Sequence, residues 1–384
     1  MTTRCRRLTT GALAVLAMVL AGCSPLIPIA RGADGEPANG RGYPATISDD
    51  GNVISFTSDA SNLVPGDTNG VRDVFVLDRR TGETTRVSVT SDGSQVSGES
   101  LTYAKVSGNG RVVVFVSTAS DLVPGDVNGE EDVFVHDLRT GVTELVSVGD
   151  DGRQATGVLF GVRPRGADIS DDGRLVAFSA TGLDTTTAEP RPFLRDRRTG
   201  RTRPVPGPAL PSGAAVGALS GDGGTFVYLV SDIDDPFAPV TLMVRDLRTG
   251  RDDALLADDH KIANYTVGID DRGRTVVWGG RDPNWHFETV VADRRDRTVE
   301  VIAATDGSGS ATSQLSSDGR YVTAFTAPPD DTTGSAAIAV LDRRRGTTTP
   351  VGLGYWTDIS DDGRAVVVET AVQEGPFLWL RPRR

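Results

Sequence analysis

The five residues ISDDG, Ile47–Gly51, recur along almost the whole chain and decide its fold. Each copy is a polar turn that ends in glycine and precedes a short apolar segment. The other six copies are VSGNG (106–110), ISDDG (169–173), LSGDG (219–223), IDDRG (269–273), LSSDG (315–319) and ISDDG (359–363). Their final glycines lie 44 to 63 residues apart, which is the period of a β-propeller blade and too long for leucine-rich or ankyrin repeats.

Each repeat predicts four β-strands. In the second repeat, RVVVF (Arg111–Phe115) follows the turn, DVFVHDLRTG (Asp132–Gly141) contains a strand and a polar turn, and TELVSV (Thr143–Val148) closes the unit. A further strand precedes each glycine turn, and we name the four strands A to D. Val, Ile, Phe and Thr between Gly, Asp and Asn are typical of strands and hairpins. A single such sheet cannot bury its faces alone, but seven packed radially can. We therefore predict an all-β fold, a seven-bladed β-propeller of four-stranded antiparallel blades.

The N-terminus has the features of an export signal. Three arginines precede the apolar segment Gly11–Leu20, which is too short for a stable membrane span and ends in LAGC at Leu20–Cys23. LAGC resembles a bacterial lipobox, in which the chain is cut before the cysteine and its thiol is acylated. We expect residues 1–22 to be a lipoprotein signal peptide, Cys23 to be lipidated and 23–25 to form the anchor; the alternative is an ordinary signal peptide with an incidental cysteine.

The last repeat lacks its fourth strand. Its strands A, B and C are predicted at 356–360, 365–369 and 377–380, after which the chain ends. Residues 27–48 parallel residues 86–107, the stretch that runs from strand D of one blade into strand A of the next. We predict that Leu26–Ala30 completes the last blade and closes a propeller that spans 26–384, which removes an exposed sheet edge. Because Pro25 and Pro28 weaken a strand prediction, a disordered tether is the alternative.

This closure predicts an orientation. The A–B and C–D turns share one face of the ring and are short and uniform, whereas the B–C and D–A connections share the other face and are long and irregular. Strand D starts on the short-turn face, so a lipid on Cys23 would hold that face against the membrane. Function is expected on the variable loops, which would point away from the membrane.

The repeated S-x-D-G turn, the apolar strand, the DVFV-type strand and the RTG turn resemble the WD40-like repeats of TolB-like β-propellers. The resemblance covers roughly residues 26–384. It departs from the family in having no proline before the aspartate of the turn, where Asp49, Gly108, Asp171, Gly221 and Asp361 stand. It also lacks the separate N-terminal α/β domain of TolB. The family includes protein-binding platforms, accessory domains of serine peptidases and a few carbohydrate-active enzymes, so the fold does not define the function.

The composition restricts the function classes. The net charge of −12 becomes −15 when residues 1–22, with three arginines and no acidic residue, are removed, which argues against nucleic acid as a partner. The sequence contains no G-x-S-x-G motif, which disfavours a peptidase. Its three histidines, His136, His260 and His286, fall in different repeats. A TolB-like pectate-fragment lyase would be expected to carry a histidine-rich metal centre, and we expect His136 to be a packing or surface residue.

Two near-identical loops are candidate calcium sites. SNLVPGDTNGVRD (Ser61–Asp73) and SDLVPGDVNGEED (Ser120–Asp132) both contain D-x-N-G-x-x-D. Oxygen ligands at this spacing could hold Ca²⁺; the candidates are Asp67, Asn69, Asp73, Asp126, Asn128 and Asp132. An Asn-Gly turn that leads into strand C explains the same residues without a metal.

Aromatic residues near the channel rim form the other candidate site. Tyrosine and tryptophan can stack on sugars or hold a peptide; the candidates are Tyr43, Tyr103, Tyr265, Trp285, His286 and Trp356. Packing between blades is the alternative for each of them.

These features lead us to expect a non-enzymatic, extracytoplasmic lipoprotein, anchored to the cell membrane and monomeric, whose propeller binds an envelope protein or a glycan. The alternatives are a propeller enzyme that acts on polysaccharide and a calcium-binding propeller module.

Overall fold

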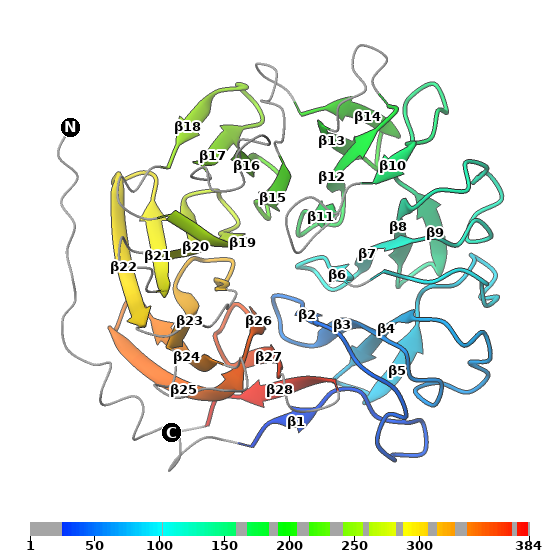
Figure 1. The fold of residues 1–384 in the computed structure, drawn as a ribbon, viewed down its shortest axis with the longest axis horizontal. Helices are drawn as coiled ribbons and strands as arrows, with labels where there is room; N and C mark the ends of the chain where they lie inside the picture. The colour runs from blue at the N-terminus through cyan, green and yellow to red at the C-terminus, as the bar shows by residue number, and fades with distance from the viewer. Residues whose placement is uncertain are drawn as a thin grey trace.

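Seven antiparallel sheets are arranged in a ring around a central axis, as the repeats predict (Figure 1). The computed structural model describes residues 25–101, 103–158, 167–183, 191–205, 215–230, 241–255, 261–281, 287–305, 313–326, 336–370 and 375–382. No helix that is long and apolar enough to cross a membrane occurs within these ranges.

The first four blades follow one another along the chain. The first comprises β2 (Thr46–Ile47), β3 (Val53–Ser58), β4 (Asp73–Asp78) and β5 (Glu83–Arg86). The second comprises β6 (Lys105–Val106), β7 (Val112–Ser117), β8 (Asp132–Asp137) and β9 (Val142–Leu145). In the third, β10 (Gly157–Val158) and β11 (Ala167–Ile169) both pair with β12 (Leu175–Thr181), which is followed by β13 (Arg191–Asp196) and β14 (Arg201–Pro204). The fourth comprises β15 (Ala215–Leu219), β16 (Thr225–Val230), β17 (Thr241–Asp246) and β18 (Asp252–Ala254).

The last three blades complete the ring. The fifth comprises β19 (Lys261–Ile269), β20 (Thr275–Arg281), β21 (Phe287–Asp293) and β22 (Thr298–Thr305). The sixth has β23 (Tyr321–Thr326), β24 (Ala336–Asp342) and β25 (Thr347–Gly354), and its innermost segment is joined by a single bridge from Leu315 to Val322. The seventh comprises β26 (Trp356–Ile359), β27 (Ala365–Glu369), β28 (Pro376–Leu380) and, at its outer edge, β1 (Ile27–Pro28).

The recurring serine explains why each A–B turn forms. The Ser48 hydroxyl oxygen accepts a hydrogen bond from the Val53 N–H at 3.0 Å, and the Gly51 N–H donates to the Ser48 carbonyl oxygen at 2.8 Å. All seven turn glycines have φ between +64° and +73°, a conformation that glycine adopts without steric cost. In the fifth blade Asp270 replaces the serine, and its carboxylate accepts the Thr275 N–H at 3.0 Å.

The hydrophobic core lies between blades. Buried apolar side chains form seven clusters, and each cluster joins two neighbouring blades. In one of them, Val76 and Val87 of the first blade pack with Val113 and Phe134 of the second. Each sheet is therefore covered on both faces by its neighbours.

The N-terminal strand closes the ring, as the sequence predicts. Ile27 and Pro28 of β1 pair with Leu378 and Phe377 of β28 (Figure 1), and the Ile29 N–H donates to the Pro376 carbonyl oxygen at 3.0 Å. Pro28 is tolerated because β1 is the outermost strand of its sheet.

Closure also adds to the core between the seventh and first blades. Ile29 and Ala30 are 3% and 6% exposed and belong to the cluster that contains Ile54 and Val367. The segment therefore contributes apolar burial as well as backbone pairing.

We expect Ile29→Ala to lower the free energy of unfolding by about 2 kcal/mol or more, because it removes a buried side chain from the closing strand. Ile27, two residues earlier, is 42% exposed, so Ile27→Ala is a matched control with an expected change within about 0.5 kcal/mol. Equilibrium denaturant unfolding measures both. If Ile29→Ala destabilises the protein no more than Ile27→Ala does, burial of Ile29 does not contribute to closure.

Candidate functional site

A belt of hydrogen bonds joins the seven A–B turns around the channel. In each blade it involves the residue after the turn serine, or after Asp270 in the fifth blade. In two blades the donor is the next residue along the chain. The N–H···O=C bonds run from Asp49 to Gly108 at 3.0 Å, and at 2.9 Å from Asn109 to Asp171, Asp171 to Gly221, Asp222 to Asp271, Asp271 to Ser317, and Asp361 to Asp49. The remaining junction is closed by the Ser317 N–H, which donates to Asp361 Oδ1 at 2.8 Å.

This belt explains the departure from the TolB-like repeat pattern. A proline before the aspartate would remove the N–H, and the N–H groups of Asp49, Asp171 and Asp361 are donors in the belt. The absence of proline at these positions therefore has a structural reason.

Carboxylates and small residues alternate around the belt. A Cβ atom on Gly221 would lie 1.7 Å from Asp171 Oδ2, and one on Gly108 would lie 2.2 Å from Asp49 Oδ2. The glycines thus leave room for the carboxyl groups of the adjacent blades. Only the seventh and first blades place two aspartates, Asp361 and Asp49, next to each other.

Burial raises the pKa of three carboxyl groups of the belt. Burial, with the charge of Asp361, raises the pKa of Asp49 to about 7. Burial, with the charges of Asp49 and Asp271, raises the pKa of Asp171 to about 8. Burial also raises the pKa of Asp361. Asp49 and Asp171 therefore retain protons near neutral pH.

The channel inside the belt is narrow. A cavity of about 70 Å³ is lined by residues from all seven blades, including Asp49, Asp171 and Asp271. One cation reaches into it, the ammonium of Lys105, which forms an ion pair with Asp168. Pockets for small organic ligands typically measure about 300–1,000 Å³. This cavity can hold water or a small ion but is too small for a sugar or a peptide.

Tyr43 lies in a charged cluster on the variable-loop face. Its hydroxyl donates to Asp59 Oδ2 at 2.8 Å and accepts from the Arg72 guanidinium at 2.7 Å. Arg72 stacks on the ring, with its guanidinium carbon 4.0 Å from the ring centroid, and forms ion pairs with Asp59 and Glu99 at 2.9 and 3.2 Å. Arg41 lies 5.1 Å from the same centroid. We call these five residues the Tyr43 cluster.

Other predicted rim residues have different surroundings. Trp356 is 3% exposed, its indole N–H donates to the Ala45 carbonyl oxygen at 3.3 Å, and its ring lies 5.4 Å from that of Tyr103. Packing between the seventh and first blades therefore accounts for Trp356. Tyr265 lies in β19, and its side chain is not described. Trp285 and His286 lie outside the described residues.

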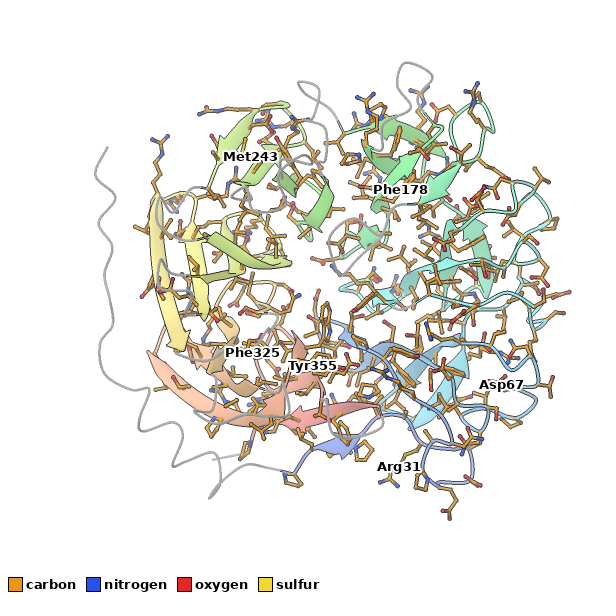
Figure 2. All side chains as sticks on the ribbon, viewed as in Figure 1. Arg31, Asp67, Phe178, Met243, Phe325 and Tyr355 are labelled. Atoms are coloured by element: carbon orange, nitrogen blue, oxygen red, sulfur yellow. The ribbon has the colours of Figure 1, made fainter. Side chains whose placement is uncertain are left out.

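Sequence reasoning missed Tyr355 and Glu369, which lie beside the Tyr43 cluster. Figure 2 places Tyr355 near the channel, and its N–H donates to the Glu369 carbonyl oxygen at 3.0 Å. Burial and a hydrogen bond to Glu369 raise the pKa of the Tyr355 hydroxyl, and burial raises the pKa of Glu369 to about 7. The positive charge of Arg41 partly offsets both shifts by lowering the pKa of Tyr355 and of Glu369. The only signal in the sequence was a second aromatic residue directly before Trp356.

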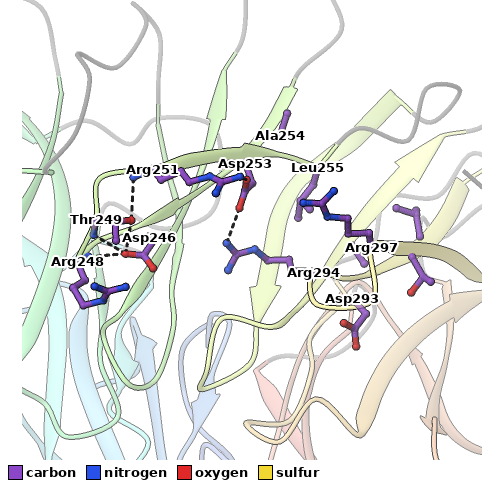
Figure 3. A pocket seen from close by; sticks show the side chains of 13 residues that line it. Asp246, Arg248, Thr249, Arg251, Asp253, Ala254, Leu255, Asp293, Arg294 and Arg297 are labelled. Carbon is purple, nitrogen blue, oxygen red and sulfur yellow. Dashed lines mark hydrogen bonds and ion pairs between the residues drawn. The ribbon is translucent and has the colours of Figure 1, made fainter. Parts of the chain in front are cut away.

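A charged groove of about 680 Å³ lies beside the short turns β17–β18 and β21–β22 (Figure 3). Arg251 and Arg294 each lie 3.4 Å from the carboxylate of Asp253, and the Arg248 N–H donates to Asp246 Oδ1 at 3.0 Å. Asp253 thus forms ion pairs with two of the four arginines that line the groove.

The two predicted calcium loops differ from each other. In the first, Arg86 forms ion pairs with Asp67 and Asp73, so the protein itself supplies a cation there. In the second, no Arg or Lys of the described residues forms an ion pair with Asp126 or Asp132.

The one histidine among the described residues is a packing residue, as expected. His136 is 6% exposed, Nδ1 lies 3.0 Å from the Thr143 hydroxyl, and burial lowers its pKa. Within the described ranges, no three or more His, Cys, Asp or Glu side chains form a metal-binding group.

No protein-family model and no curated protein sequence matches the chain. Among solved structures, an oligogalacturonate lyase in complex with manganese has a TM-score of 0.62 at 11% identity, covering 94% of this chain and 97% of its own. The β-propeller domain of the trilobed protease from Pyrococcus furiosus has a TM-score of 0.58 at 13% identity, covering 88% and 95%. TolB from Acinetobacter baumannii has a TM-score of 0.48 at 12% identity, covering 88% and 68%.

The similarity is one of fold. The seven-bladed ring is consistent with the TolB-like propeller that the repeats resemble. At these identities neither the lyase nor the protease carries its activity over to this chain.

The belt predicts that stability falls as the pH rises. Because the folded pKa values of Asp49 and Asp171 lie above the unfolded value near 4, the native state binds more protons than the unfolded state between about pH 4 and 8. Ionisation in this window therefore destabilises the fold. We expect the melting temperature of Asp171→Asn to depend less on pH between 5 and 8 than that of the wild type.

Thermal unfolding at several pH values measures this effect. Glu83→Gln, at an exposed position of β5, is the control and should retain the pH dependence of the wild type. If the melting temperature of Asp171→Asn changes with pH as much as that of the wild type, the pH dependence does not arise from Asp171.

Proposed function

We propose that the chain is a non-enzymatic cell-envelope lipoprotein whose propeller is a scaffold for binding a protein or a glycan. The observation that carries this proposal is the direction of β1. This strand enters the ring from the short-turn face, four residues after Cys23. A lipid on Cys23 would therefore hold the short turns near the membrane and leave the variable-loop face free.

The Tyr43 cluster supports binding on that free face. It draws on the D–A connections before β2 and β6 and on both ends of the loop between β3 and β4, all of which belong to the variable-loop face. Tyrosine and arginine are enriched among residues that dominate protein interfaces. The mutual contacts of Tyr43, Asp59 and Arg72 hold them in place before a partner arrives, which reduces the entropy lost on binding.

The narrow channel supports a surface site over an internal one. A cavity of about 70 Å³ does not admit a sugar residue, so a ligand of that size would have to bind at the loops. The strongly acidic chain favours a basic partner or one bridged by a metal ion.

Membrane attachment is tested with Cys23→Ser. We expect this substitution to move the protein from the membrane fraction to the soluble extracytoplasmic fraction and to abolish incorporation of labelled fatty acid. Cys5→Ser, within the predicted signal peptide, is the control and should leave both unchanged. A Cys23→Ser protein that stays with the membrane would contradict lipid anchoring.

The binding face is tested by site-specific photocrosslinking in intact cells. A photoreactive residue replaces Thr118, which is exposed beside Glu99 on the variable-loop face, or Thr140, which is exposed in the β8–β9 turn of the same blade. We expect a discrete adduct from position 118 and none from position 140. Adducts only from position 140 would place the partner on the short-turn face, and equal or absent adducts at both would contradict the proposed surface.

A further inference from the structure

The loops Ser61–Asp73 and Ser120–Asp132 share one framework. In the first, the Asn69 amide donates to Asp73 Oδ2 at 3.0 Å and to the Val96 carbonyl oxygen at 3.1 Å. In the second, the Asn128 amide donates to Asp132 Oδ2 at 2.7 Å and to the Ala155 carbonyl oxygen at 2.8 Å.

A serine hydroxyl also binds the other oxygen of the second aspartate in both loops. Ser88 donates to Asp73 Oδ1, and Ser147 donates to Asp132 Oδ1. The two loops therefore place equivalent carboxylates in equivalent surroundings, one blade apart.

An internal cation completes the first loop. The Arg86 guanidinium lies 3.2 Å from Asp67 Oδ1 and 3.5 Å from Asp73 Oδ2, so a single nitrogen bridges both carboxylates. The two aspartate side chains are 3% and 0% exposed. Figure 2 places Asp67 at the periphery of the ring, away from the channel.

The second loop lacks this cation. Arg86 pairs with Phe75 across β4 and β5, and the same register in the second blade pairs Phe134 with Leu145. Leucine thus stands where the arginine stands in the first blade. No cationic side chain in the described part of the chain forms an ion pair with Asp126 or Asp132.

The carboxyl groups of the second loop are nevertheless buried. Asp126 and Asp132 are 8% and 0% exposed, and Asp126 Oδ1 has no hydrogen-bond partner. Burial raises the pKa of Asp126 and raises that of Asp132 to about 6, where the charge of Asp126 adds to the effect. Two buried carboxylates without a countercharge are costly, so the site calls for a cation.

We propose that the loop Ser120–Asp132 binds a divalent metal ion between Asp126 and Asp132, in the role that the Arg86 guanidinium fills in the first loop. Asp126 Oδ1 is available as a ligand, and Asp132 Oδ2 is the counterpart of the oxygen that contacts Arg86. The two carboxylates balance the charge of the ion, and water completes the shell. Such a set of hard oxygen ligands suits Ca²⁺, which accepts irregular coordination more readily than Mg²⁺.

Protonation of one carboxyl group is the competing way to neutralise the pair. The two explanations make different predictions for a titration with Ca²⁺. Metal binding predicts saturable uptake of Ca²⁺ that depends on the identity of residue 145, whereas protonation predicts no uptake.

The experiment is calorimetric titration of the purified full chain with CaCl₂ at pH 8 after chelation. We expect one ion per chain, with an affinity of about 10⁻⁴ to 10⁻³ M, as in weak extracellular modules. Leu145→Arg should supply the missing guanidinium and abolish uptake, and Asp126→Asn should abolish it as well. Arg86→Leu should remove the internal cation from the first loop and double the number of bound ions.

Leu145→Met, which keeps an apolar side chain, is the matched control and should bind like the wild type. The proposal is overturned if the wild type takes up no Ca²⁺, or if Leu145→Arg binds it as the wild type does. Folded Arg86→Leu protein that gains no second ion would also count against it. Circular dichroism establishes that each variant is folded.

Discussion

Burial of both faces of every sheet is the requirement on which this structure depends. Each blade presents apolar side chains on two sides, so each needs two neighbours, and only a closed ring supplies them all. The seven inter-blade clusters are the result. The junction between the seventh and first blades joins residues more than 300 positions apart, as in the hydrogen bond from Trp356 to Ala45. The chain runs from β1 into the first blade, so the non-covalent pairing of β1 with β28 and the burial of Ile29 close the ring.

The acidic chain neutralises its buried carboxyl groups in several ways. Arg86 bridges two of them in the first blade, and Lys105 pairs with the fully buried Asp168. Around the channel, burial and mutual repulsion make Asp49 and Asp171 retain protons near neutral pH. The second blade keeps the same carboxylates as the first but has leucine in place of the arginine. Two repeats can therefore share a backbone framework and differ in whether an arginine side chain neutralises their buried carboxylates.

Much of the fold was predictable because its signals are local. The Ser-to-Gly turn is formed by contacts among residues 48 to 53 and their equivalents, so a short motif is enough to place it. The candidate site was less predictable. Tyr43 was singled out as an aromatic residue, but Arg72, which donates to its hydroxyl, and Glu99, which pairs with Arg72, lie 29 or more residues away. Trp356 looked like a rim residue of the same kind, yet it is buried, because neighbours from other blades decide exposure.

The order of the chain alone determined the number of blades, most of their strands and the missing strand that the N-terminus supplies, since each depends on a repeated pattern of turns and apolar residues. Tertiary structure decided which charged and titratable side chains lie close together. The belt of Asp49, Asp171 and Asp361, the Tyr355–Glu369 pair and the contrast between Arg86 and Leu145 all require strands from different positions to be brought into register. Electrostatic interactions depend on distance and burial in space, and neither quantity is encoded in a local motif.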